Sequence, residues 1–203
     1  MATGIDKSIT YYAKNRQAWR KWLEKNHRDS SGVWLVYYKK GSGKTRVEYA
    51  DAVEEALCFG WIDSTLNPID DEKYMQLFTP RKHKSGWSKL NKDRVEKMIA
   101  QGLMALAGHE KIEAAKKHGT WSKLDHIESF TLPPELKKAF TGNKKAMQFF
   151  EALSKTNKKY ILYYVNNVKD PEKKARRVEE IIAAANNGKM LERFTVRRKR
   201  DGN

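Results

Sequence analysis

The chain has 203 residues, of which 39% are hydrophobic and 33% charged, and its formal net charge at pH 7 is +16. This composition fits one large or two small globular domains with a real core, and it excludes a disordered chain. The positive charge attracts polyanions such as nucleic acid, anionic lipid or acidic proteins, although a lysine-rich surface that serves only solubility gives the same balance.

The N-terminal part of the chain combines helical and strand patterns. A dense β-branched and aromatic run, VWLVYY, predicts a strand at residues 33–38. Gly60 follows a helical pattern and marks its end. Further strands are expected at 61–66 and 73–81, and helices at 13–27, 50–58, 88–101 and 109–118. The helix at 88–101 should bury Val95, Met98 and Ile99.

The segment GSGKT at residues 41–45 follows a strand and precedes a helical pattern, as a nucleotide-binding P-loop does. A P-loop needs an earlier glycine so that its backbone amides can face the phosphates, and Tyr38 occupies that position. The segment is therefore interpreted as a polar loop that joins a strand to a helix.

Asp63 and Ser64 follow Trp61 at a strand end, a pattern typical of a small ligand-binding notch. The alternative is that Asp63 only caps a turn. One hypothesis is an aromatic pocket for a small ligand or substrate, lined by Trp61, Asp63, Phe78 and Trp87.

The richest cluster is FTPRKHKSGWSKLN, residues 78–91. Its basic side chains precede a helix that begins at Ser85 or Ser88, and a helix start with nearby Arg and Lys favours an anion. Trp87 offers a ring on which a nucleobase can stack, or else it packs into the core beneath a plain basic loop. The predicted binding residues are Trp61, Asp63, Ser64, Arg81, Lys82, Lys84, Trp87, Ser88 and Asn91.

The C-terminal part is helical. Leu132-Pro133-Pro134 is the stiffest point of a connector, and Pro134 suits the first turn of the next helix. Asp170 and Pro171 predict an N-cap and first turn. Helices are expected at 143–153, 157–168 and 171–185, the last with Ala175, Val178, Ile182 and Ala185 inward. Its residues Lys173, Arg176 and Arg177 form either an auxiliary basic face for phosphates or a solvated face.

These elements predict an α+β fold: an N-terminal domain with a small, mostly antiparallel sheet and flanking helices, followed by a C-terminal all-helical segment. The expected domains are residues 1–127 and 128–194, followed by a basic, disordered tail at 195–203. The basic excess is greatest at both ends of the chain, since residues 1–50 hold 11 Lys or Arg against 4 Asp or Glu and residues 151–203 hold 14 against 7.

Several chemistries have no support in the sequence. The five histidines lack metal-ligand spacing, so no metal site is expected. The single cysteine, Cys58, lies among apolar residues without a cationic neighbour, which favours an inert buried thiol. No catalytic motif or cofactor site is recognised. One cysteine, no secretory signal and no long apolar segment favour a cytoplasmic protein without a transmembrane helix.

The strings EEALCFGWIDS, FTPRKHKSGWSKLN, AAKKHGTW, LPPELKKAF and NKKYILYYV occur in this order. Together they resemble the bacterial YdeI/OmpD-associated family, also called bacteriocin-protection (OmdA) proteins, over residues 8–194. The resemblance implies a YjbR/CyaY-like N-terminal domain with a helical C-terminal region. It also implies a stress-response role linked to antimicrobial peptides and an outer-membrane porin, with residues 60–64 and 78–91 as the best shared site.

Three functions stay open. The first is a non-enzymatic cytoplasmic protein that binds a polyanion or nucleic acid through the basic loop. The second is a small-ligand protein or enzyme with the aromatic pocket near Trp61 and Asp63. The third is an envelope-stress protein that acts through a protein partner. The oligomeric state is not predicted.

Overall fold

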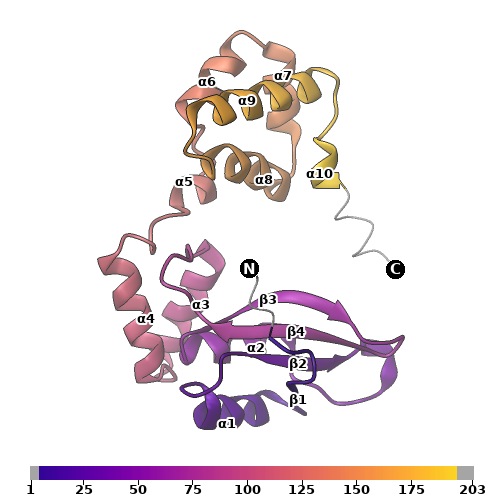
Figure 1. Ribbon diagram of the computed structural model, residues 1–203, viewed down its shortest axis with the longest axis vertical. Helices are drawn as coiled ribbons and strands as arrows, with labels where there is room; N and C mark the ends of the chain where they lie inside the picture. Colours follow the sequence, from indigo (N-terminus) through magenta and orange to yellow (C-terminus); the bar gives the residue numbers. More distant parts are fainter. Residues whose placement is uncertain (1–4, 196–203) are drawn as a thin grey trace. The chain divides into compact units, whose positions relative to one another are not determined.

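The computed structural model describes residues 5–195, and the chain divides into two compact units after Leu124 (Figure 1). The expected tail lies almost wholly outside the described residues. Each unit has its own core. Within the described part of the chain, no helix combines the length and apolar character that crossing a membrane requires.

The first unit contains a four-stranded sheet in the order β1-β2-β4-β3. β1 is parallel to β2, and the other two pairs are antiparallel. The strands are β1 (Thr10–Tyr12), β2 (Val33–Tyr38), β3 (Trp61–Pro68) and β4 (Lys73–Pro80). The predicted α+β class with a mostly antiparallel sheet is confirmed. β1, at the sheet edge, was not predicted.

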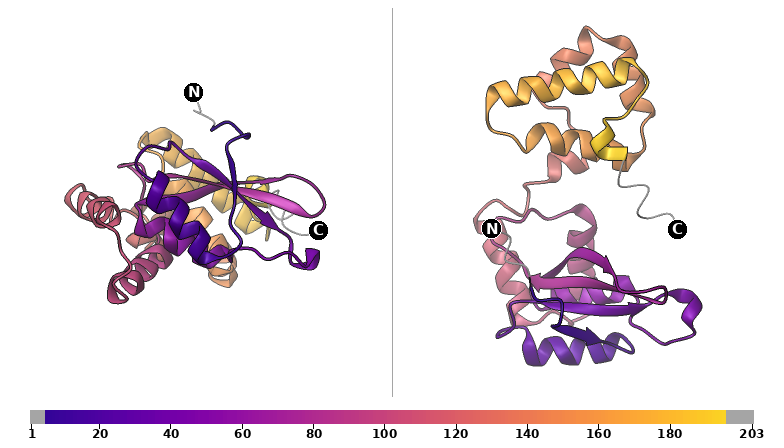
Figure 2. Two further views of the ribbon diagram at one scale, coloured as in Figure 1. Left: turned by 90° about the horizontal axis from the view of Figure 1, so that it is seen from below. Right: turned by 45° about the vertical axis from the view of Figure 1, so that its right-hand side comes forward.

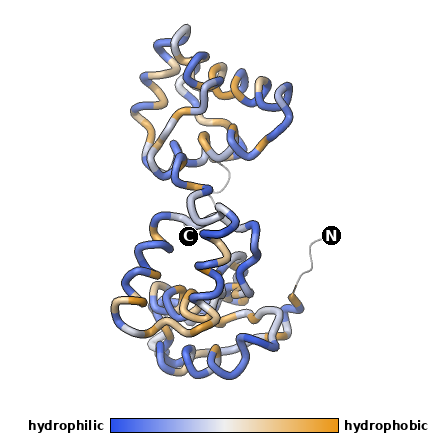
Figure 3. The backbone as a smooth tube through the Cα atoms, turned by 90° about the vertical axis from the view of Figure 1, so that its left-hand side faces the viewer, coloured by the Kyte–Doolittle hydropathy of each residue, from blue (hydrophilic) through white to orange (hydrophobic). Residues whose placement is uncertain are grey.

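Helices cover one face of this sheet and its β3–β4 end. They are α1 (Arg16–Asn26), α2 (Tyr49–Cys58), α3 (Lys89–Ala100) and α4 (Leu106–Lys117), with a short 3-10 helix η1 (Lys40–Ser42) after β2. Alternation along β2 buries Val33, Leu35 and Tyr37 against the helices. Figure 2 shows α3 and α4 near the end at which β3 begins and β4 finishes. Hydrophobic segments of the strands and α2 lie inside, and the outer helices are largely hydrophilic (Figure 3).

A buried ionic network joins α1 to α2. Glu55 is 2% exposed, and its carboxylate accepts from Arg16 Nε at 2.6 Å and from Arg20 Nη1 at 2.7 Å. Glu54, also buried, pairs with Arg16 at 2.9 Å and with Lys97 of α3 at 2.8 Å. These carboxylates are paired, as buried charges require.

Two glycines allow α4 to approach the turn between α2 and β3. Gly60 has a φ of +72°, and a Cβ there would lie 2.6 Å from Cγ of Lys111 and 2.9 Å from the carbonyl oxygen of Ala107. A Cβ on Gly108 would lie 2.8 Å from the carbonyl carbon of Cys58. Only glycine fits either position without movement, and the resulting approach brings Lys111 to the end of the sheet.

The second unit is wholly helical in its described part. Its helices are α5 (Asp125–Glu128), α6 (Pro134–Thr141), α7 (Lys144–Ala152), α8 (Lys155–Asn166), α9 (Pro171–Asn186) and α10 (Glu192–Thr195). The prolines act as predicted, because Pro134 opens α6 and Pro171 opens α9. Asp170 caps α9 by accepting from the amide of Lys173 at 2.9 Å.

Two apolar faces differ from the prediction. Ile99 is 43% exposed, whereas Val95 and Met98 are buried as expected. In α9 the buried residues are Val178, Ile181 and Ala185, and Ala175 is exposed. Both misplaced positions lie at the margin of a helical face, where the partner helix and not the spacing decides which side chain is covered.

Candidate functional site

The segment that links β4 to α3 holds most of the predicted binding residues. Its first residue is fixed to the adjacent turn, because the Arg81 amide donates to the carbonyl oxygen of Gly60 at 2.9 Å. Its last residue, Ser88, is the N-cap of α3, and its Oγ accepts from the amide of Asn91 at 3.3 Å. Three exposed basic residues, Lys82, His83 and Lys84, lie between these anchors.

Arg81 is a buried cation with no carboxylate in salt-bridge range among the described residues. It is only 5% exposed. Its guanidinium lies 3.7 Å above the ring centroid of Trp87 and donates through Nη2 to the carbonyl oxygen of Gly86. Its buried Nε has no hydrogen-bond partner in the part of the chain that the structure describes. Burial lowers the pKa of Arg81 to about 10, against an opposing effect of the Asp63 charge.

The tryptophans of this region belong to the core. Trp87 is 1% exposed, with Arg81 over its ring and Trp121 at a centroid distance of 4.9 Å. Its ring is therefore not available to stack a nucleobase, and the alternative of a core tryptophan holds. Trp61 is equally buried and donates to the carbonyl oxygen of His27 at 3.1 Å. Because Phe78 is fully buried too, these three rings line no open aromatic pocket.

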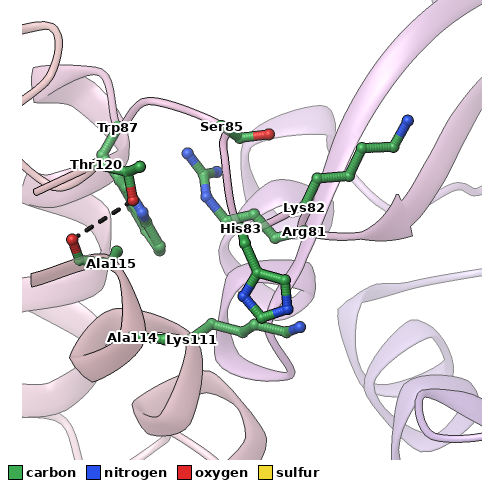
Figure 4. Close-up of a pocket in the computed structure, with 9 residues that line it drawn as sticks. All are labelled: Arg81, Lys82, His83, Ser85, Trp87, Lys111, Ala114, Ala115 and Thr120. Atoms are coloured by element: carbon green, nitrogen blue, oxygen red, sulfur yellow. Dashed lines mark hydrogen bonds between the residues drawn. The ribbon is translucent and has the colours of Figure 1, made fainter. Parts of the chain in front are cut away.

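A small cavity lies between the loop after β4 and helix α4 (Figure 4). Its volume of about 10 Å³ has room for one water-sized group. No carboxylate contributes to its wall. The lining residues are Arg81, Lys82, His83, Ser85, Trp87, Lys111, Ala114, Ala115 and Thr120.

An open groove lies on the other side of the same loop, over the sheet face that α2 does not cover. Its floor includes Ile62 and Leu77. Asp63 at its margin accepts from Tyr49 Oη at 2.7 Å and from Gln76 Nε2 at 3.3 Å, so this carboxylate is engaged within the unit. The groove brings together six predicted residues: Asp63, Ser64, Arg81, Lys82, Ser88 and Asn91. It does not include Trp61, Lys84 or Trp87.

Two site residues were missed from sequence. Lys111 of α4 lines the cavity beside Arg81. Lys123 donates to the carbonyl oxygen of Lys84 at 3.1 Å, which ties a distant loop to the basic loop. The string KKHGTWSK, residues 116–123, combines a helix end, a glycine and basic residues, and it was the available signal for Lys123. We call Lys82, Lys84, Lys111 and Lys123 the basic surface. Among the residues described, none of the four has a carboxylate within 4.0 Å.

The auxiliary basic face of α9 is only partly present. Arg177 donates to the carbonyl oxygen of Tyr164 at 2.6 Å, and its guanidinium lies 4.2 Å from the Tyr164 ring centroid. It is therefore engaged within the second unit. Lys173 and Arg176 are exposed. Between residues 5 and 195 no cluster of His, Cys, Asp or Glu is suited to hold a metal ion.

Two protein-family models match separate parts of the chain. Residues 129–188 match the family described as bacteriocin-protection, YdeI or OmpD-associated. Residues 11–111 match a domain of unknown function, DUF8412, so a YjbR/CyaY-like identity for the N-terminal domain gains no support. No match is found among curated proteins or solved structures.

Proposed function

We propose that this protein is a non-enzymatic binder of polyanions, nucleic acid above all, and that the basic surface makes the contact. The observation that carries the proposal is the convergence of Lys82, Lys84, Lys111 and Lys123 from three segments of the first unit, none of them with a carboxylate within 4.0 Å among the described residues. Lysine side chains in such a group contact phosphates, which supplies affinity without base specificity.

The burial of Trp87 refines this proposal. No tryptophan of the basic loop is exposed for stacking, which favours contact with the phosphate backbone over recognition of bases. Trp121 is half-buried, and Lys116 lies over its ring with Nζ 5.9 Å from the centroid. Because contact with the phosphate backbone does not require exposed bases, we expect duplex and single-stranded nucleic acid to bind with similar affinity. We also propose that the protein acts in the cytoplasm.

The test is a fluorescence-anisotropy titration with labelled duplex and single-stranded DNA over a series of salt concentrations. Wild type is compared with the triple variant Lys82→Ala/Lys84→Ala/Lys123→Ala. Each lost phosphate contact on duplex DNA lowers the slope of log K against log salt by about 0.9, so the variant should lose roughly 2 to 3 from the slope.

A matched control removes the same charge elsewhere. Lys39, Lys40 and Lys44 are exposed, and the loop after β2 that carries them lies outside both the cavity and the groove. The variant Lys39→Ala/Lys40→Ala/Lys44→Ala should retain the wild-type slope. Equal losses in both variants would mean that net charge alone drives binding, and no binding at low salt would end the proposal.

The OmdA-type match of the C-terminal region favours a second candidate, a role in tolerance of antimicrobial peptides. Direct capture of such peptides is disfavoured, because they are mostly cationic and the chain carries +16. Binding of a protein partner by the second unit is more compatible with the net charge of +16 than direct capture of a cationic peptide is. Survival of a deletion strain under bacteriocin, equal to that of its parent, would count against this candidate.

A further inference from the structure

We propose that the cavity beside Arg81 is a site for one phosphate group, either inorganic phosphate or the terminal phosphate of a nucleic acid. The proposal rests on the proposed function only if the ligand is the terminal phosphate of a nucleic acid. Its first observation is the Nε of Arg81, a buried donor without a hydrogen-bond partner among the described residues, in a side chain that lines the cavity. Buried donors of this kind are rare unless water or a ligand completes them.

The charge of Arg81 points to an anion more than to a neutral ligand. A buried guanidinium normally faces a carboxylate, because removal of the charge from water is unfavourable unless an opposite charge compensates for it. Among the described residues, the guanidinium contacts the Trp87 ring and one carbonyl oxygen, and neither carries a full negative charge. An anion in the cavity supplies the missing negative charge and accepts a hydrogen bond from the Nε–H of Arg81.

The rest of the wall suits a tetrahedral oxyanion. Lys82 and Lys111 add two cations, and Ser85 and Thr120 add hydroxyl groups. The Thr120 hydroxyl already donates to the Ala115 carbonyl oxygen at 3.4 Å, which leaves its oxygen lone pairs and not its proton for the site (Figure 4). The cations and Ser85 are therefore the donors.

The size of the cavity limits how a ligand enters. A volume of about 10 Å³ admits one oxygen-sized group and excludes a sugar or a base. One phosphoryl oxygen therefore sits against Arg81, and the other oxygens remain at the mouth of the cavity, which Lys82 and Lys111 help to line. A terminal phosphate reaches this position more easily than an internal phosphodiester, whose two ester links hinder its approach.

The direct measurement is the NMR signal of the Arg81 Nε–H during titration with inorganic phosphate at constant ionic strength. A saturable shift with a Kd near 1 mM or tighter, corresponding to about −4 kcal/mol or more, is expected. Chloride at the same ionic strength should leave the signal in place. A shift of equal size with chloride, or no shift with phosphate up to roughly 20 mM, would overturn the proposal, and a water would then be the partner of Nε.

Variants localise the effect without removal of the buried arginine. Lys111→Gln and Lys82→Gln should each weaken phosphate binding by about fivefold or more, as loss of one charged partner does. Lys44→Gln is the matched control, since Lys44 is exposed and lines neither the cavity nor the groove, and it should bind phosphate as wild type does. Equal weakening by all three substitutions would contradict a localised site.

A second arm separates the two sources of phosphate. Single-stranded oligonucleotides with a terminal phosphate or a terminal hydroxyl are compared by anisotropy. Tighter binding of the phosphorylated strand, lost in Lys111→Gln, identifies the nucleic-acid end as the ligand. Equal binding of both strands, together with the NMR shift, identifies free phosphate. Phosphate binding without any oligonucleotide binding would refute the polyanion function and leave the phosphate site intact.

Discussion

Replacement of Gly108 by alanine probes the contact that positions α4. The new Cβ would lie 2.6 Å from Cε of Met104 and 2.8 Å from the carbonyl carbon of Cys58, and closer still to the carbonyl oxygen. The methionine end can rotate away. The Cys58 carbonyl cannot, because it belongs to the end of α2 and accepts from the amide of Ala105 at 3.1 Å. α4 must therefore move away from α2.

Three effects determine how much Gly108→Ala lowers the free energy of unfolding. Overpacking that forces a backbone shift costs about 1–3 kcal/mol. The weakened hydrogen bond to Cys58 costs roughly 1 kcal/mol. Alanine in place of glycine inside a helix returns about 1 kcal/mol. The free energy of unfolding of the first unit should fall by about 2 kcal/mol, and phosphate binding should weaken because Lys111 moves with α4.

Urea unfolding followed by tryptophan fluorescence measures this directly. All six tryptophans lie within the first unit, so their emission reports the unfolding of that unit alone. Gly41→Ala is the control, because a Cβ there meets nothing within 4 Å and the backbone is not left-handed. If Gly108→Ala unfolds at the same urea concentration as wild type and Gly41→Ala, the proposed close approach of α4 is refuted.

Three further predictions concern stability. Glu55→Ala should lower the free energy of unfolding by about 3 kcal/mol in urea titrations, because Arg16 and Arg20 lose a buried partner; a change below about 1 kcal/mol would show the network to be solvated. Burial raises the pKa of Cys58 from 9.0 to about 11, so the neutral thiol is favoured in the folded state. Stability from this group is complete below pH 9 and is lost as pH rises towards about 11, so unfolding titrations at pH 8 and pH 10.5 should differ for wild type more than for Cys58→Ala. Asp170→Ala should destabilise α9 by about 1 kcal/mol and shift the melt measured by circular dichroism, with the fluorescence melt unchanged.

Local patterns predicted most of the fold. The run VWLVYY and the strand β2 have the same bounds, residues 33–38, because continuous β-branched and aromatic residues leave little choice of conformation. Ser88 and Asp170 start their helices as expected, since capping depends on neighbouring residues only. β1 was missed because its three residues gain their strand conformation from pairing with β2, which lies far along the chain.

The candidate site was less predictable for the same reason. The sequence indicated the basic loop and its helix start correctly, yet it could not decide whether Trp87 faces solvent or the core. That outcome depends on Trp121, which follows more than thirty residues later. Lys111 reaches the cavity only because Gly60 and Gly108 let α4 come close. Such placement is a property of packing between distant segments and not of residue spacing.

The two edges of the sheet have a consequence for behaviour at high concentration. Open strand edges invite a second molecule to add its own strand, and this is a common start of aggregation. Here one edge, β1, is three residues long. The other, β3, is interrupted by a register shift between Asp63 and Leu66 and finishes at Pro68, which has no amide hydrogen to donate. Neither edge offers a long regular strand for pairing. We therefore expect that copies of this chain do not associate by pairing of their sheet edges, even at high protein concentration.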